Sequence, residues 1–530
     1  MINWVALSVF IFFFLLVTVL GFVAARWRRG DLNQLDEWGL AGRRFGAVVT
    51  WFLLGGDLYT AYTFVAVPGL MYATGAQGFF AVPYTILVYP LIFLLMPKFW
   101  SVCRQYNYVT PADFVQGRFG SSTLALLIAL TGIVATMPYI ALQMFGIEVS
   151  IAQMGVNVEV ALIIAFLILA AYTYSSGLRA PALIALVKDS MIFIVLIAAI
   201  IIIPIKLGGF GPIFAAAHQK AVVSAAAAAA ATAAHKTPPT VFHDILAPAQ
   251  FLPYTTLAIG SALALFLYPH SLTGTLSSNS RDVVKRNTAL LPIYSLMLGL
   301  LALLGYMAIA AHVTLPKAYG SNAAVPALID QEFPSWFAGF AFAAIAIGAL
   351  VPAAIMSIAA ANLFTRNIYR VYFRPRYSAR EEANVAKITS LVVKFGALLF
   401  ILLVPTTYII NFQLLGGILI IQTLPAVFLG LYTNWFHRWA MVIGWAAGMI
   451  SGIWMFIAAN FSSVYVFNIG GQKYGIYGAV SSLILNLLLA VIFTPIFRAA
   501  GIASGKDVTR PTDYEEAIPE KAEPLPEALA

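Results

Sequence analysis

Hydrophobic positions form long runs along this chain, and most polar positions lie in the short stretches between them. The first run reads NWVALSVFIFFFLLVTVLGFVAA and lacks a basic leader and a small-residue cleavage site, so we expect a retained helix rather than a signal peptide. A run of about 20 apolar residues crosses the hydrocarbon core of a bilayer. The pattern predicts about thirteen such helices, near residues 2–24, 46–73, 78–100, 121–151, 156–174, 181–206, 252–277, 288–312, 336–367, 387–408, 412–432, 438–460 and 475–497.

The charges between the runs predict how the chain crosses the membrane. When odd-numbered helices end on the inner side, about three quarters of the 30 lysine and arginine residues fall in the loops and tail on that side. Because basic loops stay in the cytoplasm, we expect an outer N-terminus and a cytoplasmic C-terminus in the plasma (inner) membrane. This topology accounts for the net charge of +9, and we expect no nucleic-acid partner.

The composition argues against several other classes of protein. With 61% hydrophobic and only 10% charged residues, the chain has too little charge for the surface of a soluble protein of 530 residues. The single cysteine, Cys103, excludes a disulfide framework or a cysteine metal cluster within one chain. The sequence contains no H-E-x-x-H, G-x-S-x-G or P-loop. We therefore expect neither an enzyme or sensor nor an organic cofactor.

Two segments are predicted to lie outside the membrane. Residues 209–250 form an outer loop whose alanine tract, AVVSAAAAAAATAAHKTPP, is either a short helix or a low-complexity spacer. Residues 499–530 are acidic and proline-rich, which predicts a disordered cytoplasmic tail. The predicted organisation is an extra helix with its loop, a first five-helix repeat, the outer loop, a second five-helix repeat, two C-terminal helices and the tail, at residues 1–45, 46–208, 209–250, 251–432, 433–498 and 499–530.

Two of the predicted spans carry signals of a broken helix. The second contains GGD at residues 55–57, and the seventh contains YPH at residues 268–270. Within a bilayer a helix breaks only where protein or water satisfies the freed backbone groups. Four spans separate the two breaks, so they begin successive five-helix units, and the odd number makes the second unit inverted. Interrupted helices at matching positions predict the binding site of a transporter, although a packing kink is an alternative for either break alone.

The polar side chains beside the breaks are the candidate site. A carboxylate at this depth costs about 2.5–3.5 kcal/mol on insertion scales, which favours a functional role for Asp57. The neighbouring hydroxyl groups fit either hydrogen bonding between helices or a wet site at mid-depth. A small anion suits such a site because the N-termini of half-helices offer free N–H groups. The candidates for binding the solute are Thr60, Tyr62, Thr63, Tyr268 and His270.

Several segments resemble one known family. GALVPAAIMSIAAANLFTRNIYR at residues 348–370 resembles the signature of the sodium:solute symporter family. Further segments resemble that family in the same order, namely AGRRFG (41–46), TPADFVQGRFG (110–120), SGLRA (176–180), YPH (268–270) and LPAVFLGLYTNWFHRWAMVIGWAAG (424–448). This resemblance implies an all-α polytopic membrane protein with thirteen helices, a leucine-transporter-type 5+5 inverted-repeat core and alternating access.

The resemblance also implies an ion site. By motif, a sodium ion would lie between the second and ninth helices, held by the carbonyl groups of Gly56, Tyr59 and Ala354 and the hydroxyl group of Ser357. A hard cation prefers such oxygen ligands. The family has a second hydroxyl group after this serine, whereas this chain has Ile358.

Two carboxylates are candidates for a proton or ion path, Asp57 and Asp189. Lys188 and Asp189 resemble a Thr-Asp pair of the family's sixth helix, shifted by about one helical turn. Mutual neutralisation of these adjacent charges is an equal alternative to a role in ion movement.

The stretch around Asp57 (Gly56, Thr60, Ala61, Thr63 and Phe64) resembles the branch of the family that carries acetate and other short monocarboxylates. We therefore expect a symporter that imports pyruvate, lactate or acetate with Na⁺ across the lipid bilayer. Alternatives are coupling to H⁺, which Ile358 and Asp57 favour, and another solute class such as an amino acid, sugar or vitamin. A helical channel is a further alternative.

Overall fold

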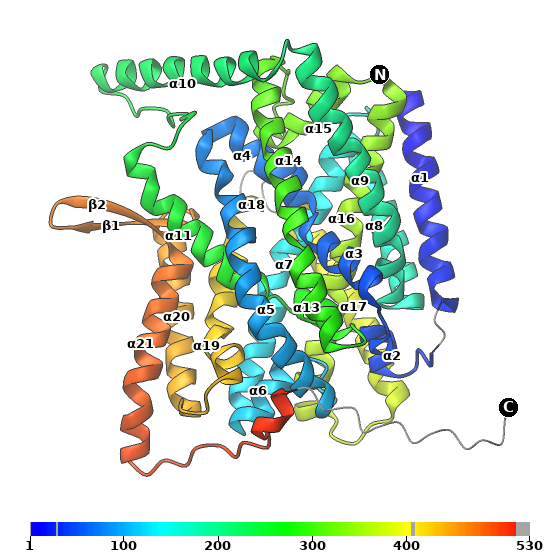
Figure 1. Cartoon of the computed structure of the whole chain (residues 1–530), viewed down its shortest axis with the longest axis vertical. Helices are drawn as coiled ribbons and strands as arrows, with labels where there is room; N and C mark the ends of the chain where they lie inside the picture. The colour runs from blue at the N-terminus through cyan, green and yellow to red at the C-terminus, as the bar shows by residue number, and fades with distance from the viewer. Residues whose placement is uncertain (1, 28–29, 404–408, 516–530) are drawn as a thin grey trace.

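The computed structural model describes residues 2–27, 30–403 and 409–515 and is almost entirely helical. Most helices run side by side along the long axis of the molecule (Figure 1). Residues 404–408, the expected end of the tenth span, and residues 516–530 of the expected tail lie outside the described residues.

The spans follow the expected order. They are α1 (Trp4–Val23), α3 with α4 (Ala47–Leu58 and Val67–Thr74), α5 (Ala81–Gln105), α7 (Ser122–Ala152), α8 (Val158–Ser176), α9 (Arg179–Lys206), α11 with α12 (Pro248–Leu265 and Pro269–Leu276), α13 with α14 (Arg281–Leu290 and Pro292–Ala310), α16 (Ser335–Phe364), α17 (Ala379–Leu403), α18 with α19 (Ile409–Ile420 and Leu424–Val427), α20 (Arg438–Ala458) and α21 (Gly478–Ala499). Shorter helices are α2 (Leu35–Leu40), α6 (Pro111–Phe119) and α15 (Ala324–Glu332).

Length and composition support this count. In the described part of the chain, 12 helices are long and apolar enough to cross a membrane, and the bent pair α11–α12 makes up to 13. One of the 12 is α10 (Phe210–Ala233), which projects sideways at the end of the bundle where the N-terminus lies (Figure 1), and only 11% of its most apolar 18-residue window is buried. We therefore place α10 outside the bundle. The broken span α3–α4, whose halves are each too short to cross alone, takes its place.

The centre of the bundle is α16. Its most apolar 18-residue window is wholly buried, whereas 28% of the corresponding window is buried in α1 and in α21. The helix contacts α1, α7, α9 and α17, as well as both halves of the site described below, α3 and α12. A helix that is apolar all round suits such a central position.

Two segments refine or differ from the expectations for the loops. The alanine tract is helical and forms much of α10. An unexpected antiparallel hairpin, β1 (Val464–Ile469) and β2 (Gln472–Tyr477), precedes α21. Its two-residue loop is Gly470-Gly471, and both glycines have positive φ, of 60° and 82°, as a tight hairpin turn requires.

The beginning of the tail is ordered, in contrast to the expected disorder. The Tyr106 hydroxyl group donates to the Val508 carbonyl oxygen and to Asp513, both at 2.7 Å. Arg118 forms an ion pair with Asp507 at 2.5 Å. These contacts hold the described part of the tail against α5 and α6, because basic and aromatic groups there pair with its carboxylates.

Candidate functional site

The first helix break lies directly after Leu58, where α3 ends. Tyr59 is extended, with φ −88° and ψ 91°, and a π-helical turn begins at Tyr62. The Thr60 hydroxyl group accepts a hydrogen bond from the Tyr62 amide at 3.0 Å, and the Thr63 hydroxyl group donates to the Thr60 carbonyl oxygen at 2.7 Å. The two threonine side chains therefore replace backbone hydrogen bonds that the break removes.

An amide from another span completes this replacement. The Gln143 side chain on α7 is fully buried, and its Oε1 accepts a hydrogen bond from the Ala61 amide at 3.0 Å. The sequence analysis missed this residue. A signal was present, because a lone amide within the apolar run IALQMFG is costly in hydrocarbon and indicates a polar partner inside the protein.

The second break separates α11 from α12, which meet at a bend of 46°. Tyr268 is extended, and Pro269 occupies the first turn of α12, where its missing N–H group costs nothing. The two breaks meet at Asp57. Its Oδ2 accepts a hydrogen bond from the Ser271 hydroxyl group at 2.9 Å and lies 3.6 Å from Nε2 of His270. The expectation that the two interrupted spans come together is therefore confirmed.

The free carbonyl groups of the first break accept hydrogen bonds from a lysine side chain. Nζ of Lys188, on α9, donates to the carbonyl oxygens of Gly56 and Tyr59 at 2.5 and 3.0 Å. It also lies 3.1 Å from Oδ1 of Asp189, and both side chains are fully buried. The Tyr294 hydroxyl group donates to the other oxygen of Asp189 at 2.8 Å. The ammonium group thus donates to two backbone carbonyl oxygens and forms an ion pair with the carboxylate of Asp189.

Two glycines allow this close approach. A Cβ atom on Gly56 would lie 2.9 Å from Nζ of Lys188 and 3.1 Å from a carboxylate oxygen of Asp189. A Cβ atom on Gly55 would lie 2.1 Å from the ring of Tyr294. The Gly-Gly pair that signalled the break therefore also makes room for the lysine, the aspartate and the tyrosine.

The sodium ion implied by the resemblance does not fit these residues. Two of its four expected ligands, the carbonyl groups of Gly56 and Tyr59, are bonded to Lys188. The hydroxyl group of Ser357 donates back to the Ala354 carbonyl oxygen at 2.8 Å. The Ser357 oxygen in turn accepts a hydrogen bond from Ser390, which bonds Lys394. All four expected ligands are therefore engaged within the protein.

A small cavity of about 30 Å³ lies beside the second break. Hydroxyl-bearing aromatic side chains from several helices dominate its wall, together with Gln413. Within the described residues, the Tyr268 hydroxyl group and Gln413 Oε1 are buried without a hydrogen-bond partner. Such unpaired polar groups suit a polar ligand. The tyrosines of the wall are Tyr62, Tyr84, Tyr139, Tyr268 and Tyr477.

The expected solute-binding residues thus divide into two groups. Tyr62 and Tyr268 line the cavity, and His270 packs edge-on against Tyr139, with ring centroids 5.5 Å apart. Thr60 and Thr63 instead bond the backbone of the break. No signal in the sequence indicates that Tyr139, from the separate apolar helix α7, lines the cavity with them.

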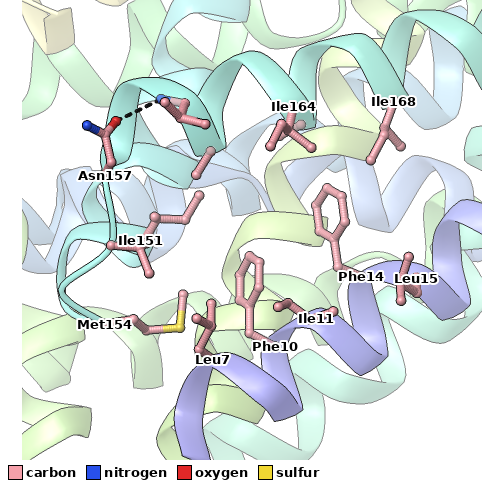
Figure 2. A pocket seen from close by; sticks show the side chains of 14 residues that line it. Leu7, Phe10, Ile11, Phe14, Leu15, Ile151, Met154, Asn157, Ile164 and Ile168 are labelled. Carbon is pink, nitrogen blue, oxygen red and sulfur yellow. Dashed lines mark hydrogen bonds between the residues drawn. The ribbon is translucent and has the colours of Figure 1, made fainter. Parts of the chain in front are cut away.

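A larger groove of about 460 Å³ between α1 and α8 is unsuited to an anion. Figure 2 shows that apolar side chains such as Phe10, Phe14 and Ile164 line it. Its one polar side chain, Asn157, is already used, because its Oδ1 accepts a hydrogen bond from the Val160 amide at 3.0 Å. The groove therefore matches hydrocarbon chains and not a charged solute.

Comparison with known proteins places these features in a family. Residues 38–452 match the model of the Sodium:solute symporter family. The chain is 52% identical over 499 residues to a monocarboxylate transport permease protein of Rhizobium johnstonii, an alignment that covers 94% of this chain and 98% of the relative. It is 32% identical over 499 residues to the uncharacterized symporter YodF of Bacillus subtilis, covering 93% of this chain and 94% of that one.

A solved structure agrees with the fold. A Na⁺-coupled sialic acid symporter in a substrate-bound, outward-open state superposes with a TM-score of 0.71 at 17% identity, covering 95% of this chain and 99% of the other. Together with the count of spans, this likeness confirms the expected helical transporter fold with a leucine-transporter-type core. At this identity the likeness concerns the fold alone.

Proposed function

The chain belongs to the sodium:solute symporter family, and from this membership we propose that it imports a short monocarboxylate by cation-coupled symport. The relative that is 52% identical over most of both chains is named a monocarboxylate transport permease. The observation that carries the proposal is the cavity wall, where tyrosine hydroxyl groups gather beside the meeting point of the two breaks.

The chemistry of the cavity wall suits a small carboxylate, although the cavity itself is narrow in this structure. A volume of about 30 Å³ is about the space of one water molecule, so the cavity must widen to admit acetate, the smallest of the three expected acids, and would have to widen much further for a sugar. A phenolic hydroxyl group donates a strong, charge-assisted hydrogen bond to a carboxylate. The unpartnered hydroxyl group of Tyr268 is the first candidate donor, and Tyr62 on the opposite break is the second.

The N-terminus of α12 is less free than the sequence led us to expect. The first amides of a helix attract an anion, but Asp57 already lies there, bonded to Ser271 and close to His270. A solute carboxylate that approaches this helix end therefore meets a carboxylate of the protein. A neutral Asp57 would remove the repulsion between the two.

These observations bear on the coupling cation. Sodium is the ion in the family's name, and the sequence resemblance also favours sodium as the coupling ion. The engagement of the Gly56 and Tyr59 carbonyl groups by Lys188 and the position of Asp57 favour the second candidate, coupling to a proton. In that case the proton that enters with the solute compensates the negative charge of the carboxylate.

Uptake into proteoliposomes tests both parts of this proposal. Purified protein is reconstituted, and labelled acetate, lactate and pyruvate are supplied under an imposed sodium gradient or an imposed pH gradient, each with the other gradient collapsed. We expect saturable accumulation against a concentration difference, with mutual competition among the three acids. Failure of all three acids to accumulate under either gradient would refute the proposed function, and equilibration without accumulation would indicate a channel.

A further inference from the structure

We propose that the ammonium group of Lys188 is the resident cation of the site where the family implies sodium, so that this transporter works without a bound sodium ion there. This inference deepens the proposed function. The expected effect on uptake rests on that function, whereas the expected effect on sodium binding is independent of the identity of the solute.

The first support is the geometry at the end of α3. Carbonyl groups in the last turn of a helix carry partial negative charge and have no partner within the helix. They attract a cation from elsewhere. Lys188 supplies that cation at 2.5 Å from the Gly56 carbonyl oxygen and 3.0 Å from that of Tyr59. A metal ion on the same two oxygens would overlap the ammonium group, so the two cations exclude each other.

The second support is the way Lys188 is held. Asp189 lies at 3.1 Å and balances its charge within a fully buried pair. Tyr294 bonds the other oxygen of Asp189 at 2.8 Å, and the Tyr59 hydroxyl group donates to the backbone carbonyl oxygen of Tyr294 at 3.1 Å. The break, the lysine, the aspartate and the tyrosine thus form a closed ring of contacts, as expected of a built cation site.

The third support comes from the opposite half of the expected site. The second hydroxyl group of the family is absent, because Ile358 takes its place. The remaining hydroxyl group, of Ser357, bonds Ser390 at 3.1 Å, and Ser390 bonds Nζ of the buried Lys394 at 2.7 Å. A second ammonium group, that of Lys394, therefore lies one hydrogen bond beyond Ser357. A sodium ion would lose ligands both at the first break and on α16.

Sodium binding to purified protein tests the inference directly. Melting temperatures are measured in detergent with sodium chloride and with matched choline chloride, for the unmodified protein, Lys188→Ala, Ile358→Ser and the double variant Lys188→Ala/Ile358→Ser. A ligand that binds only the folded state raises the melting temperature. We expect no sodium-specific shift for the unmodified protein or for Ile358→Ser, and a clear upward shift for the double variant.

Each outcome decides the matter. A sodium-specific shift in the unmodified protein would overturn the inference, because the lysine would then not exclude the ion. A shift in Ile358→Ser alone would overturn it as well, since the missing hydroxyl group and not the lysine would be the obstacle. A folded double variant without a sodium shift would show that removing the ammonium group does not open a sodium site, and this too would refute it.

Uptake provides a second readout that does not depend on the variants. With the pH gradient clamped, replacing sodium by choline should leave carboxylate uptake by the unmodified protein unchanged. Loss of uptake in choline would contradict the inference while leaving the proposed monocarboxylate function intact. Conversely, absence of carboxylate uptake in either salt would refute that function without affecting the sodium-binding result.

Discussion

Replacement of Gly56 by alanine is a severe test of the contacts that hold Lys188 at the first helix break, namely those with the Gly56 and Tyr59 carbonyl groups and with Asp189. The added Cβ atom would lie 2.9 Å from Nζ of Lys188 and 3.1 and 3.3 Å from the two carboxylate oxygens of Asp189. The lysine is the movable partner, because its ammonium group ends a flexible chain. It can yield only by moving away from the carbonyl oxygens of Gly56 and Tyr59, which it contacts at 2.5 and 3.0 Å.

The magnitude follows from the bonds at risk. A hydrogen bond to a charged group contributes about 1.5–3 kcal/mol, while alanine in place of glycine within a helix gains about 1 kcal/mol. Loss of one of the two carbonyl contacts should therefore lower the free energy of unfolding by a net ~0.5–2 kcal/mol. Loss of both contacts would lower it further. For a chain of 530 residues the melting temperature should fall by roughly 0.5–2 °C, and the uptake rate should fall with it.

A matched control lies in another membrane helix. A Cβ atom on Gly299 of α14 would lie 3.7 Å from its nearest neighbour, a methyl group of Val82, which is an ordinary contact. Gly299→Ala should therefore leave the melting temperature in detergent unchanged or raise it slightly. If Gly56→Ala melts and transports like Gly299→Ala, then the ammonium group of Lys188 does not lie against the carbonyl groups of Gly56 and Tyr59, and the proposed cation site is refuted.

Four further changes give separate tests. Asp57→Asn mimics the neutral carboxyl group and should flatten the pH dependence of uptake, and an unaltered pH profile would argue against a role of Asp57 in proton coupling. Tyr268→Phe removes a candidate donor worth about 1.5–3 kcal/mol and should raise KM roughly tenfold or more; Tyr172→Phe, which removes a buried, unpartnered hydroxyl group on α8, is the control. Lys394→Met removes a buried charge with no carboxylate within ion-pair distance among the described residues, so it should raise the melting temperature; a fall would show that its bond to Ser390 stabilises the fold. Arg118→Ala should release the tail because the ion pair with Asp507 is lost. Limited proteolysis between residues 502 and 515 should then become faster, whereas replacing the exposed Arg104 by alanine should not change that rate.

The sequence was informative where the physics is local. Apolar runs of bilayer length predicted the spans, since a segment in the hydrocarbon core must have apolar side chains and must satisfy its own backbone hydrogen bonds. The Gly-Gly pair and Pro269 marked both breaks, because a missing side chain and a missing N–H group leave local traces in the sequence. The hairpin was missed because the turn Gly470-Gly471 lies in a short polar gap between two strong apolar runs.

The sequence was less informative where the physics joins distant segments. Lys188 and Gly56 are 132 residues apart, and no spacing rule places an ammonium group on a particular carbonyl oxygen. From the sequence, mutual neutralisation of Lys188 and Asp189 and a role in ion movement are equal alternatives. Neutralisation describes only half of the geometry, since the ammonium group pairs with the aspartate and also donates to the carbonyl groups of the break. The cavity wall was equally hidden, because its tyrosines come from separate helices.

The two breaks share one electrostatic principle. Each leaves the end of a helix dipole buried inside the protein, the negative end of α3 and the positive end of α12. The chain places its own counterion at each, Lys188 at the first and Asp57 at the second. With both helix ends compensated from within, the proposed carboxylate solute would find its strongest free donors among the tyrosine hydroxyl groups of the cavity. Under the proposed coupling to a proton, binding at α12 would require that Asp57 lose its charge, and repulsion between the two carboxylates would link the arrival of the anion to that of the proton.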